Sequence, residues 1–342
     1  MGGFMLIFPI EHQYRSNCSI DRGHNRNNIT LSIPMSEPNP RESELVLGGQ
    51  NPPPINAAIL GGEAGKKRQL ANELGLSGQL AYEVTQDCDI FSFENVVLTK
   101  CGRFVSRTQK KAFYYTKILS DDATLDMVYI PAGTFIMGSD NYYWEQPIHS
   151  VTLKSFYMAK YPTTQIQYQS VVGKNPSRFV RNDFPVEQVL WYDTQEFCEK
   201  LALLTQKTYK LPSESQWEYA CCVNRLEPNN VKGFGETINY AQREQTINVG
   251  TFPANAFGLY DMRVNVWEWC LDDYHYNYQD APDDGSPWLD KNNNTQISKP
   301  LRGGYGSGDG SARMSRFPNR PHVAPVQENV GFRVVLSIEE CI

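Results

Sequence analysis

The sequence lacks the short motifs that mark several common kinds of active site. It contains no Walker-type phosphate loop, no GxSxG nucleophile motif and no HExxH zinc motif. Its eight cysteines, at positions 18, 88, 101, 198, 221, 222, 270 and 341, form no CxxC pair and no regular spacing. Cys198, Cys222 and Cys270 stand beside apolar or aromatic residues, which favours reduced, buried thiols. These absences favour a protein of the reducing cytoplasm.

Long apolar runs and an excess of positive charge are also missing. No stretch approaches the ~18 apolar residues of a membrane span, and the N-terminal MGGFMLIFPIEHQYR has neither a basic leader nor a small-residue cleavage site. The net charge is −6 with a pI of about 5.5, which is unfavourable for binding a phosphate backbone. We therefore expect a soluble cytoplasmic protein with no membrane span and no nucleic-acid partner.

The composition changes along the chain and predicts four regions. Residues 1–62 are rich in Asn, Pro, Ser and Arg and carry the proline run Asn51–Pro54. They are expected to form a disordered tail, with a docking peptide for a partner domain as the alternative. Helix formers in 63–85 predict a short helix. In 86–119, β-forming residues on both sides of Gly102 predict a β-hairpin extension, and 120–338 reads as the main domain.

Within the main domain, the patterns predict strands followed by three capped helices. Met127–Gly138 reads as strand, turn and strand, and His149–Leu153 alternates like a half-buried strand. The helices are expected to begin at Thr163, at Asp193 and at Ser213, where Asp193-x-x-Glu196 and Ser213-x-x-Gln216 have capping-box spacing. Phe197, Leu201 and Leu204 recur at helical spacing and predict one buried stripe on the second helix.

Three segments carry a resemblance to a known family. They are the strand pair at 127–138, TYKLPSESQWEYA at 208–220 and FGLYDMRVNVWEWC at 257–270. In the last, Trp267 and Trp269 would point to one face of an extended segment. The three segments resemble the formylglycine-generating enzyme, or sulfatase-modifying factor, family. The resemblance implies an α+β, C-type-lectin-like domain with little regular secondary structure at 120–338, preceded by the hairpin extension and the disordered tail.

The resemblance also implies a calcium site in the 257–270 segment. Its ligands would be the side chains of Asp261 and Glu268 and the main-chain carbonyls of Val264 and Val266, an oxygen set that suits Ca²⁺. The chain departs from the family here, because Arg263-Val264 stands where Ser-Gly or a similar pair is usual. Asp272 and Asp273 are a second carboxylate pair, read either as further Ca²⁺ ligands or as solvated surface groups.

Neither catalytic metal site of the family's enzymes is expected. Copper-dependent members use a cysteine pair after a Gly-Gly motif, and the matching segment here, 302–313, contains no cysteine. Iron-dependent relatives use three clustered histidines, whereas the five histidines here, at 12, 24, 149, 275 and 322, are far apart. We expect no catalytic residues, no copper and no iron. The alternative is a metal-dependent oxidase of the same family with an altered active site.

The segment between the frames LRGG and GFRVV has neither helical nor strand periodicity. It resembles the corresponding segment of the variable proteins of diversity-generating retroelements, in which adenines of Asn codons are randomised. Most residue types here are reachable from an Asn codon by changing adenines; Met314, Gln327 and Glu328 are not. Aromatic and guanidinium anchors among small polar residues are typical of a binding surface. The predicted ligand-binding residues within 305–329 are Tyr305, Ser307, Asp309, Ser311, Arg313, Arg316, Phe317, Asn319, Arg320 and His322.

Three functions remain open at this point. The first is a non-catalytic protein that binds a partner protein or another macromolecular ligand through 305–329, diversified by a retroelement. The second is the altered oxidase. The third is a structural subunit whose N-terminal tail recruits the partner while 305–329 is inert.

Overall fold

The structure is a computed structural model of the full chain, and it describes residues 62–98, 104–140, 142–221, 245–290, 298–304, 317–319 and 329–338. All of these residues belong to one unit, Ala57–Ile342. Apart from Gly62, the predicted disordered tail 1–62 lies outside the described residues.

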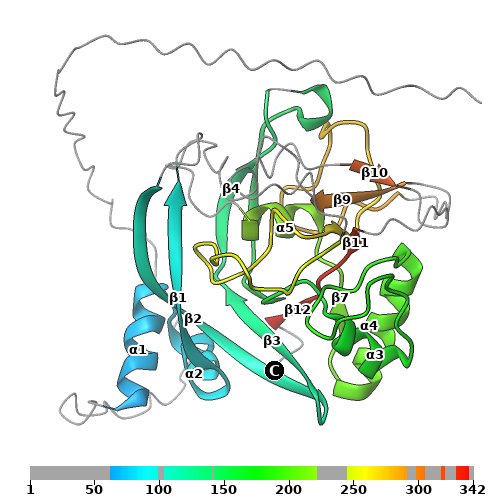
Figure 1. The fold of residues 1–342 in the computed structure, drawn as a ribbon. Coiled ribbons are helices and arrows are strands. Elements are labelled where there is room, and N and C mark those ends of the chain that lie inside the picture. Colours follow the sequence, from blue (N-terminus) through cyan, green and yellow to red (C-terminus); the bar gives the residue numbers. More distant parts are fainter. Residues whose placement is uncertain are drawn as a thin grey trace, which may run out of the picture. The chain divides into compact units, whose positions relative to one another are not determined.

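Two helices and a long hairpin precede the main domain (Figure 1). Helices α1 (Glu63–Glu73) and α2 (Gly78–Asp87) take the place of the single short helix expected in 63–85. Strand β1 (Asp89–Leu98) pairs antiparallel with β2 (Phe104–Ser120), which is the predicted hairpin. Leu70 of α1 and Val84 of α2 are buried in the same hydrophobic cluster as Phe113 of β2, so the helices pack on the hairpin through apolar contacts.

The hairpin continues directly into the sheet of the main domain. Strand order in this six-stranded sheet is β1-β2-β3-β6-β12-β7, where β3 is Ala123–Ile130, β6 is Phe156–Ala159, β12 is Val335–Ser337 and β7 is Tyr209–Lys210. All five pairings are antiparallel. Because β12 comes last in the chain yet lies between β6 and β7, the sheet forms only when distant parts of the chain meet.

Three helices follow β6, and their first residues show which capping predictions were right. Helix α3 (Gln165–Val172) is capped by Thr164, whose hydroxyl accepts from the Gln167 amide, so the cap expected at Thr163 is one residue too early. Helix α5 (Glu214–Cys221) has the predicted box: Ser213 Oγ accepts from the Gln216 N–H at 3.1 Å, and Gln216 Oε1 accepts from the Ser213 N–H at 2.9 Å.

Helix α4 (Trp191–Thr205) differs from the prediction at both ends. It starts two residues before Asp193, whose carboxylate accepts from the Leu190 N–H at 2.8 Å instead of capping the helix itself. Phe197 and Leu201 are fully buried as expected, but Leu204 is 49% exposed. The buried stripe therefore turns toward Cys198 and Thr205, and Leu204 does not belong to it.

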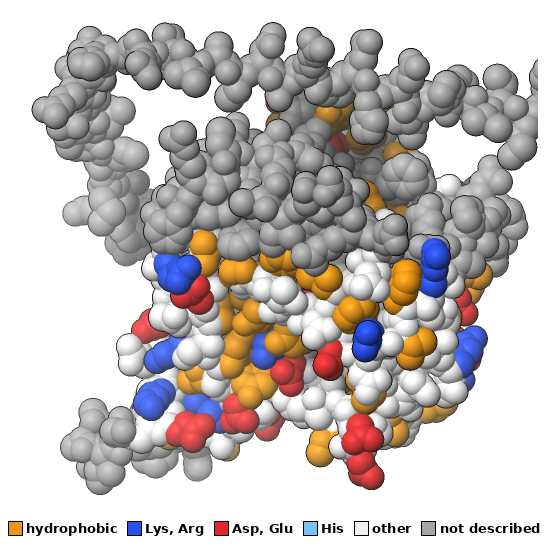
Figure 2. Space-filling view, in the orientation of Figure 1, with side chains coloured by type: hydrophobic (Ala, Val, Ile, Leu, Met, Phe, Trp, Pro, Cys, Tyr) orange, Lys and Arg blue, Asp and Glu red, His pale blue; other side chains and the backbone are white. Residues whose placement is uncertain are grey.

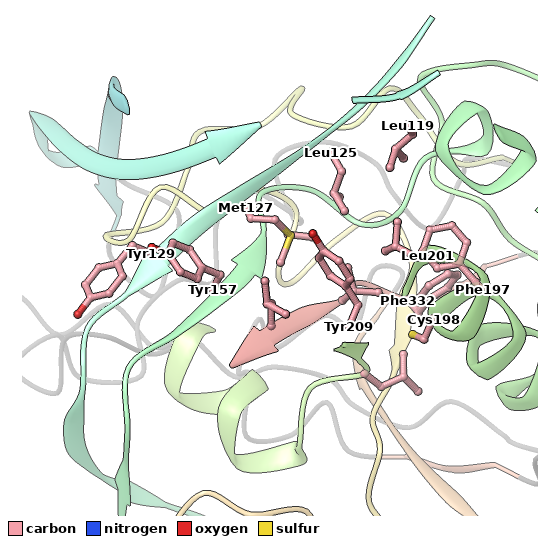
Figure 3. Close-up of a cluster of buried hydrophobic side chains, with 14 of the residues drawn as sticks. Leu119, Leu125, Met127, Tyr129, Tyr157, Phe197, Cys198, Leu201, Tyr209 and Phe332 are labelled. Carbon is pink, nitrogen blue, oxygen red and sulfur yellow. The ribbon is translucent and has the colours of Figure 1, made fainter. Parts of the chain in front are cut away.

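The main core lies between α3, α4 and the six-stranded sheet. Met127, Tyr157 and Tyr209 come from the sheet, and Phe197 meets Phe332 with ring centroids 5.2 Å apart (Figure 3). Burying each such side chain stabilises the fold by about 1.5–3 kcal/mol. On the face that Figure 2 shows, hydrophobic side chains lie among charged ones.

A smaller sheet completes the fold, in the strand order β10-β9-β8-β11. These strands are β8 (Trp267–Trp269), β9 (Lys299–Gly303), β10 (Phe317–Asn319) and β11 (Val330–Gly331). A separate pair, β4 (Gly133–Met137) and β5 (His149–Leu153), flanks the short 3-10 helix η1 (Tyr143–Glu145). No helix in the described parts of the chain has the length and apolar character needed to cross a bilayer.

Candidate functional site: the sheet around Trp267

Strand β8 is short, yet it holds the centre of the smaller sheet. Trp267 and Trp269 lie on the same side and contribute to one hydrophobic cluster, as the spacing predicts. Trp269 is 1% exposed, and its indole N–H donates to the Val189 carbonyl at 3.0 Å. Glu268, between the two tryptophans, points the other way and is fully buried. The tryptophans therefore fix the strand, and Glu268 presents a charge to the interior.

Both ends of the segment 305–328 are attached to β8. At the first end, the Gly304 N–H donates to the Val266 carbonyl at 3.4 Å, and Gly303 pairs with Trp267. At the second end, the Trp267 N–H donates to the Asn329 carbonyl at 2.7 Å, and Val330 pairs with Trp267 in parallel. The chain thus leaves and re-enters the fold on opposite sides of one tryptophan.

Glycine is required where the segment leaves the sheet. Gly304 has a φ of +124°, and a Cβ there would lie 2.7 Å from the Trp267 ring. The Gly304 backbone therefore lies closer to the ring than a residue with a Cβ atom could, as expected for the Gly-Gly pair.

Most of the predicted ligand-binding residues lie outside the described residues. These are Tyr305, Ser307, Asp309, Ser311, Arg313, Arg316, Arg320 and His322. The backbones of Phe317 and Asn319 lie in β10, which pairs antiparallel with β9 at Leu301 and Lys299. The ligand-binding assignments stay predictions. The smaller sheet holds the segment that carries them at its two ends and at β10.

A fully buried ion pair lies beneath β8. Arg333 donates to both carboxylate oxygens of Glu268 at 2.7 Å, and the Trp217 indole N–H donates to the same carboxylate at 2.8 Å. Arg333 also donates to the carbonyls of Ala159 and Tyr260. A two-point guanidinium–carboxylate pair with extra hydrogen bonds is a stiff arrangement, and it joins β8 to the segment before β12.

A second buried arginine supports β9. Arg302 donates to Glu214 at 3.0 Å and to Glu218 at 2.7 Å, both on α5, and to the Tyr278 hydroxyl at 3.3 Å. Arg302, Glu214 and Glu218 are 0%, 3% and 1% exposed. The sequence patterns do not predict these ion pairs. The signal that could have found them is the arginine inside each of the strand-like runs LRGG and GFRVV, because a buried arginine requires a buried carboxylate partner.

The predicted calcium ligands are close in sequence but differ in what they already bind. Asp261, with a φ of +60°, accepts from the Gly250 N–H at 2.8 Å, while its buried Oδ1 has no hydrogen-bond partner among the residues that the structure describes. Burial raises the pKa of Asp261 to about 6. The Val264 and Val266 carbonyls accept from the Val266 and Gly304 N–H groups. Such oxygens fit Ca²⁺, whereas Glu268 would have to give up hydrogen bonds to Arg333. The calcium site stays a prediction.

The cysteines that the structure describes lie in the interior. Cys88, Cys198, Cys221 and Cys270 are buried, and none of the four is in a disulfide. Burial raises the pKa of Cys198 to about 12 and that of Cys270 well above its ordinary value. These two thiols therefore stay protonated near neutral pH and do not supply thiolate ligands. Within the described ranges, no three His, Cys, Asp or Glu side chains are arranged to hold a metal ion.

The mixed sheets, the few short helices and the Trp-rich strand β8 define a C-type-lectin-like fold of the formylglycine-generating-enzyme type, as the sequence predicts. The chain belongs to the sulfatase-modifying factor enzyme 1-like domain family, whose model matches residues 116–338. The β1–β2 hairpin largely precedes that match.

Individual relatives agree with this assignment. The chain is 27% identical over 237 residues to "Chaperone protein LppX" of Paenibacillus barcinonensis, covering 51% of this chain and 82% of that one. Some other curated relatives are longer proteins, of which the match covers 28% to 38%.

Two solved structures are similar in fold. PvdO from Pseudomonas aeruginosa superposes with a TM-score of 0.56 at 26% identity, covering 65% of this chain and 97% of that one. Variable protein 1 of Treponema denticola superposes with a TM-score of 0.56 at 24% identity, covering 66% and 99%. The second likeness concerns the fold alone.

Proposed function

We propose that this protein is a non-catalytic binding protein that recognises a partner protein or another macromolecular ligand through residues 305–329. The observation that carries the proposal is the attachment of both ends of this segment to Trp267 of β8. Hydrogen bonds at Gly304 and Asn329, together with the buried ion pairs of Arg302 and Arg333, support both ends. A scaffold fixed in this way suits replacement of the residues it displays, because connecting segments on a rigid scaffold tolerate sequence change better than the elements that they join.

The same segment carries no thiol. Residues 302–331 contain no cysteine, and the described cysteines elsewhere are buried. The two soft ligands of the copper-dependent mechanism are therefore missing where the family places them. We propose further that the segment is diversified by a retroelement, a role consistent with a fold shared with variable protein 1 of Treponema denticola. A near-copy of the codons for 302–331, differing only at adenines and located beside a reverse transcriptase gene, would establish this part.

The binding proposal is tested with a triple variant, Tyr305→Ala, Arg316→Ala and Phe317→Ala. Proteins captured by the immobilised wild type and by the variant are compared by quantitative mass spectrometry. We expect the specific partner to be lost at least tenfold while the melting temperature stays within a few degrees of the wild type. The matched control is Tyr82→Ala on α2, an exposed tyrosine far along the chain from the segment. Capture that survives the triple variant would contradict the proposal and favour recruitment by residues 1–62.

The oxidase alternative is measured directly. Purified protein is assayed for bound copper and iron, and oxygen uptake is followed with a cysteine-containing peptide. Stoichiometric metal together with turnover of the thiol would replace the binding proposal with an enzymatic function.

A further inference from the structure

A second surface, built from segments other than 305–329, combines exposed aromatic rings with unbalanced negative charge. It is built from two segments, 138–149 around η1 and 271–290. Together these segments contain eight Asp and Glu residues and no Lys or Arg. The whole chain has 32 basic and 38 acidic residues, so its charges nearly balance. The excess of acidic residues in these two segments is therefore a local feature.

Four aromatic side chains lie at the meeting point of the two segments. Tyr142 and Trp144 stack with ring centroids 4.8 Å apart and planes 13° apart. Tyr143 lies 5.5 Å from Tyr276 of the other segment, centroid to centroid. Tyr143, Trp144 and Tyr276 are 56%, 37% and 69% exposed, which is unusual for such large side chains in a group.

The rings are held in place by hydrogen bonds between the two segments. The Tyr278 N–H donates to the Gln146 carbonyl at 2.6 Å, and Asn277 Nδ2 donates to the Tyr143 hydroxyl at 2.9 Å. Within the first segment, Gln146 Nε2 donates to the Asp140 carbonyl at 3.2 Å. Ring positions fixed in this way lose little freedom when a ligand binds.

The carboxylates of these segments divide into two groups. Some are engaged inside the fold: Asp272 accepts from the N–H groups of Glu214 and Trp288, and Asp273 forms an ion pair with Lys299 at 2.7 Å. Asp140 and Asp280 are exposed, and the described residues provide neither with a Lys or Arg partner. Both are close in sequence to the rings, since Asp140 stands two positions before Tyr142 and Asp280 four positions after Tyr276.

We propose that Tyr142, Tyr143, Trp144 and Tyr276, with Asp140 and Asp280, form a site for an arginine-rich segment of a partner protein. A guanidinium group stacks flat on an aromatic ring and pairs with a carboxylate in two-point geometry, so it uses both features of the surface at once. The protein already holds cations this way internally, with Lys160 Nζ 4.4 Å from the centroid of Phe91 and Lys299 Nζ 4.2 Å from that of Trp191.

The test uses fluorescein-labelled hexa-arginine peptide and fluorescence anisotropy at ~150 mM salt, where weak long-range attraction is largely screened. We expect saturable binding to the full chain. Tyr143→Ala with Tyr276→Ala should weaken it at least tenfold, and so should Asp140→Asn with Asp280→Asn. The second pair changes only surface carboxylates, so it remains informative if the aromatic variant fails to fold.

Matched controls separate this site from general attraction to an acidic protein. Asp121→Asn with Asp122→Asn removes the same charge from two exposed positions between β2 and β3, and Tyr82→Ala removes an equally exposed ring from α2. Both controls should bind hexa-arginine as the wild type does. The triple variant of Tyr305, Arg316 and Phe317 should also bind it normally, which distinguishes this site from the one proposed above.

Three results would overturn the inference. One is an equal loss of affinity in the Asp121/Asp122 control, which would mean that net charge alone is sensed. Another is hexa-lysine binding as tightly as hexa-arginine with no effect of removing the rings. The third is binding of a neutral oligosaccharide such as maltohexaose to the rings with no binding of hexa-arginine, which would identify a sugar site instead.

Discussion

Replacing Glu268 by Gln tests whether the ion pair with Arg333 holds the scaffold together. Both side chains are fully buried, and Arg333 donates to both oxygens of the carboxylate. The substitution keeps the shape and one acceptor but removes the carboxylate to which the guanidinium is hydrogen-bonded, leaving buried Asp261 as the carboxylate that interacts with Arg333. Breaking a buried pair by removing one partner costs about 3–5 kcal/mol. We expect a loss of this size in the free energy of unfolding.

The measurement is urea-induced unfolding followed by fluorescence, with two comparison variants. In the first, Glu196→Gln breaks the exposed pair with Lys200, 2.8 Å long on the surface of α4, and should cost at most about 0.5 kcal/mol. In the second, Arg333→Met is added to Glu268→Gln, which removes the stranded charge and should recover part of the loss. A cost below ~1 kcal/mol for Glu268→Gln would refute the reasoning, because the charge would then not be desolvated.

Three further predictions follow from the site. Gly304→Ala should destabilise the protein by about 1–3 kcal/mol in thermal unfolding, because the added methyl group would meet the Trp267 ring and the backbone has a φ of +124°. The control Gly75→Ala, at a φ of +70° with nothing within 4 Å of the added methyl group, should cost about 1 kcal/mol. Equal costs would contradict the close-contact explanation. Burial and the neighbouring Glu214 raise the pKa of Asp272 to about 7, above its unfolded value of about 3.9. The folded state therefore binds the proton more tightly, so this group lowers stability progressively as pH rises from about 4 to about 7; the melting temperature of the wild type relative to Asp272→Asn should fall over that range, and a constant difference would argue against the shift. If Ca²⁺ binds at Asp261, millimolar CaCl₂ should raise the melting temperature over an EDTA-treated sample in the wild type but not in Asp261→Ala, and no change in the wild type would remove the calcium prediction.

Local sequence signals predicted the family, the fold class and several element boundaries. The Ser213–Gln216 box is a four-residue pattern whose partners are set by helix geometry alone, so it appears in the structure as predicted. The cap one residue late at Thr164 shows the limit of such reasoning, since adjacent Thr163 and Thr164 are equally good caps and tertiary contacts select one. Leu204 fits the helical period, but the partner surface at the end of α4 does not extend far enough to cover it.

The support of the candidate site was beyond the reach of local patterns. Arg302 and Arg333 find their carboxylates on α5 and β8, far away in the chain, and no periodicity encodes such a pairing. The strand order explains why: β11 and β12 pair with strands that lie much earlier in the chain, so their neighbours are fixed only in three dimensions. The ring cluster at η1 was missed for the same reason, because Tyr143 and Tyr276 stand 133 positions apart in the printed sequence.

The attachment of Gly303 and Asn329 to Trp267 has a consequence for insertions and deletions. A change in length between Asn319, where β10 ends, and Asn329 does not alter the register of any strand in the smaller sheet. Its cost is then mainly the entropy of closing a longer loop, which grows by only about 0.6 kcal/mol for each doubling. Homologous chains could therefore differ in the number of residues carried between these two points while keeping the same sheet beneath.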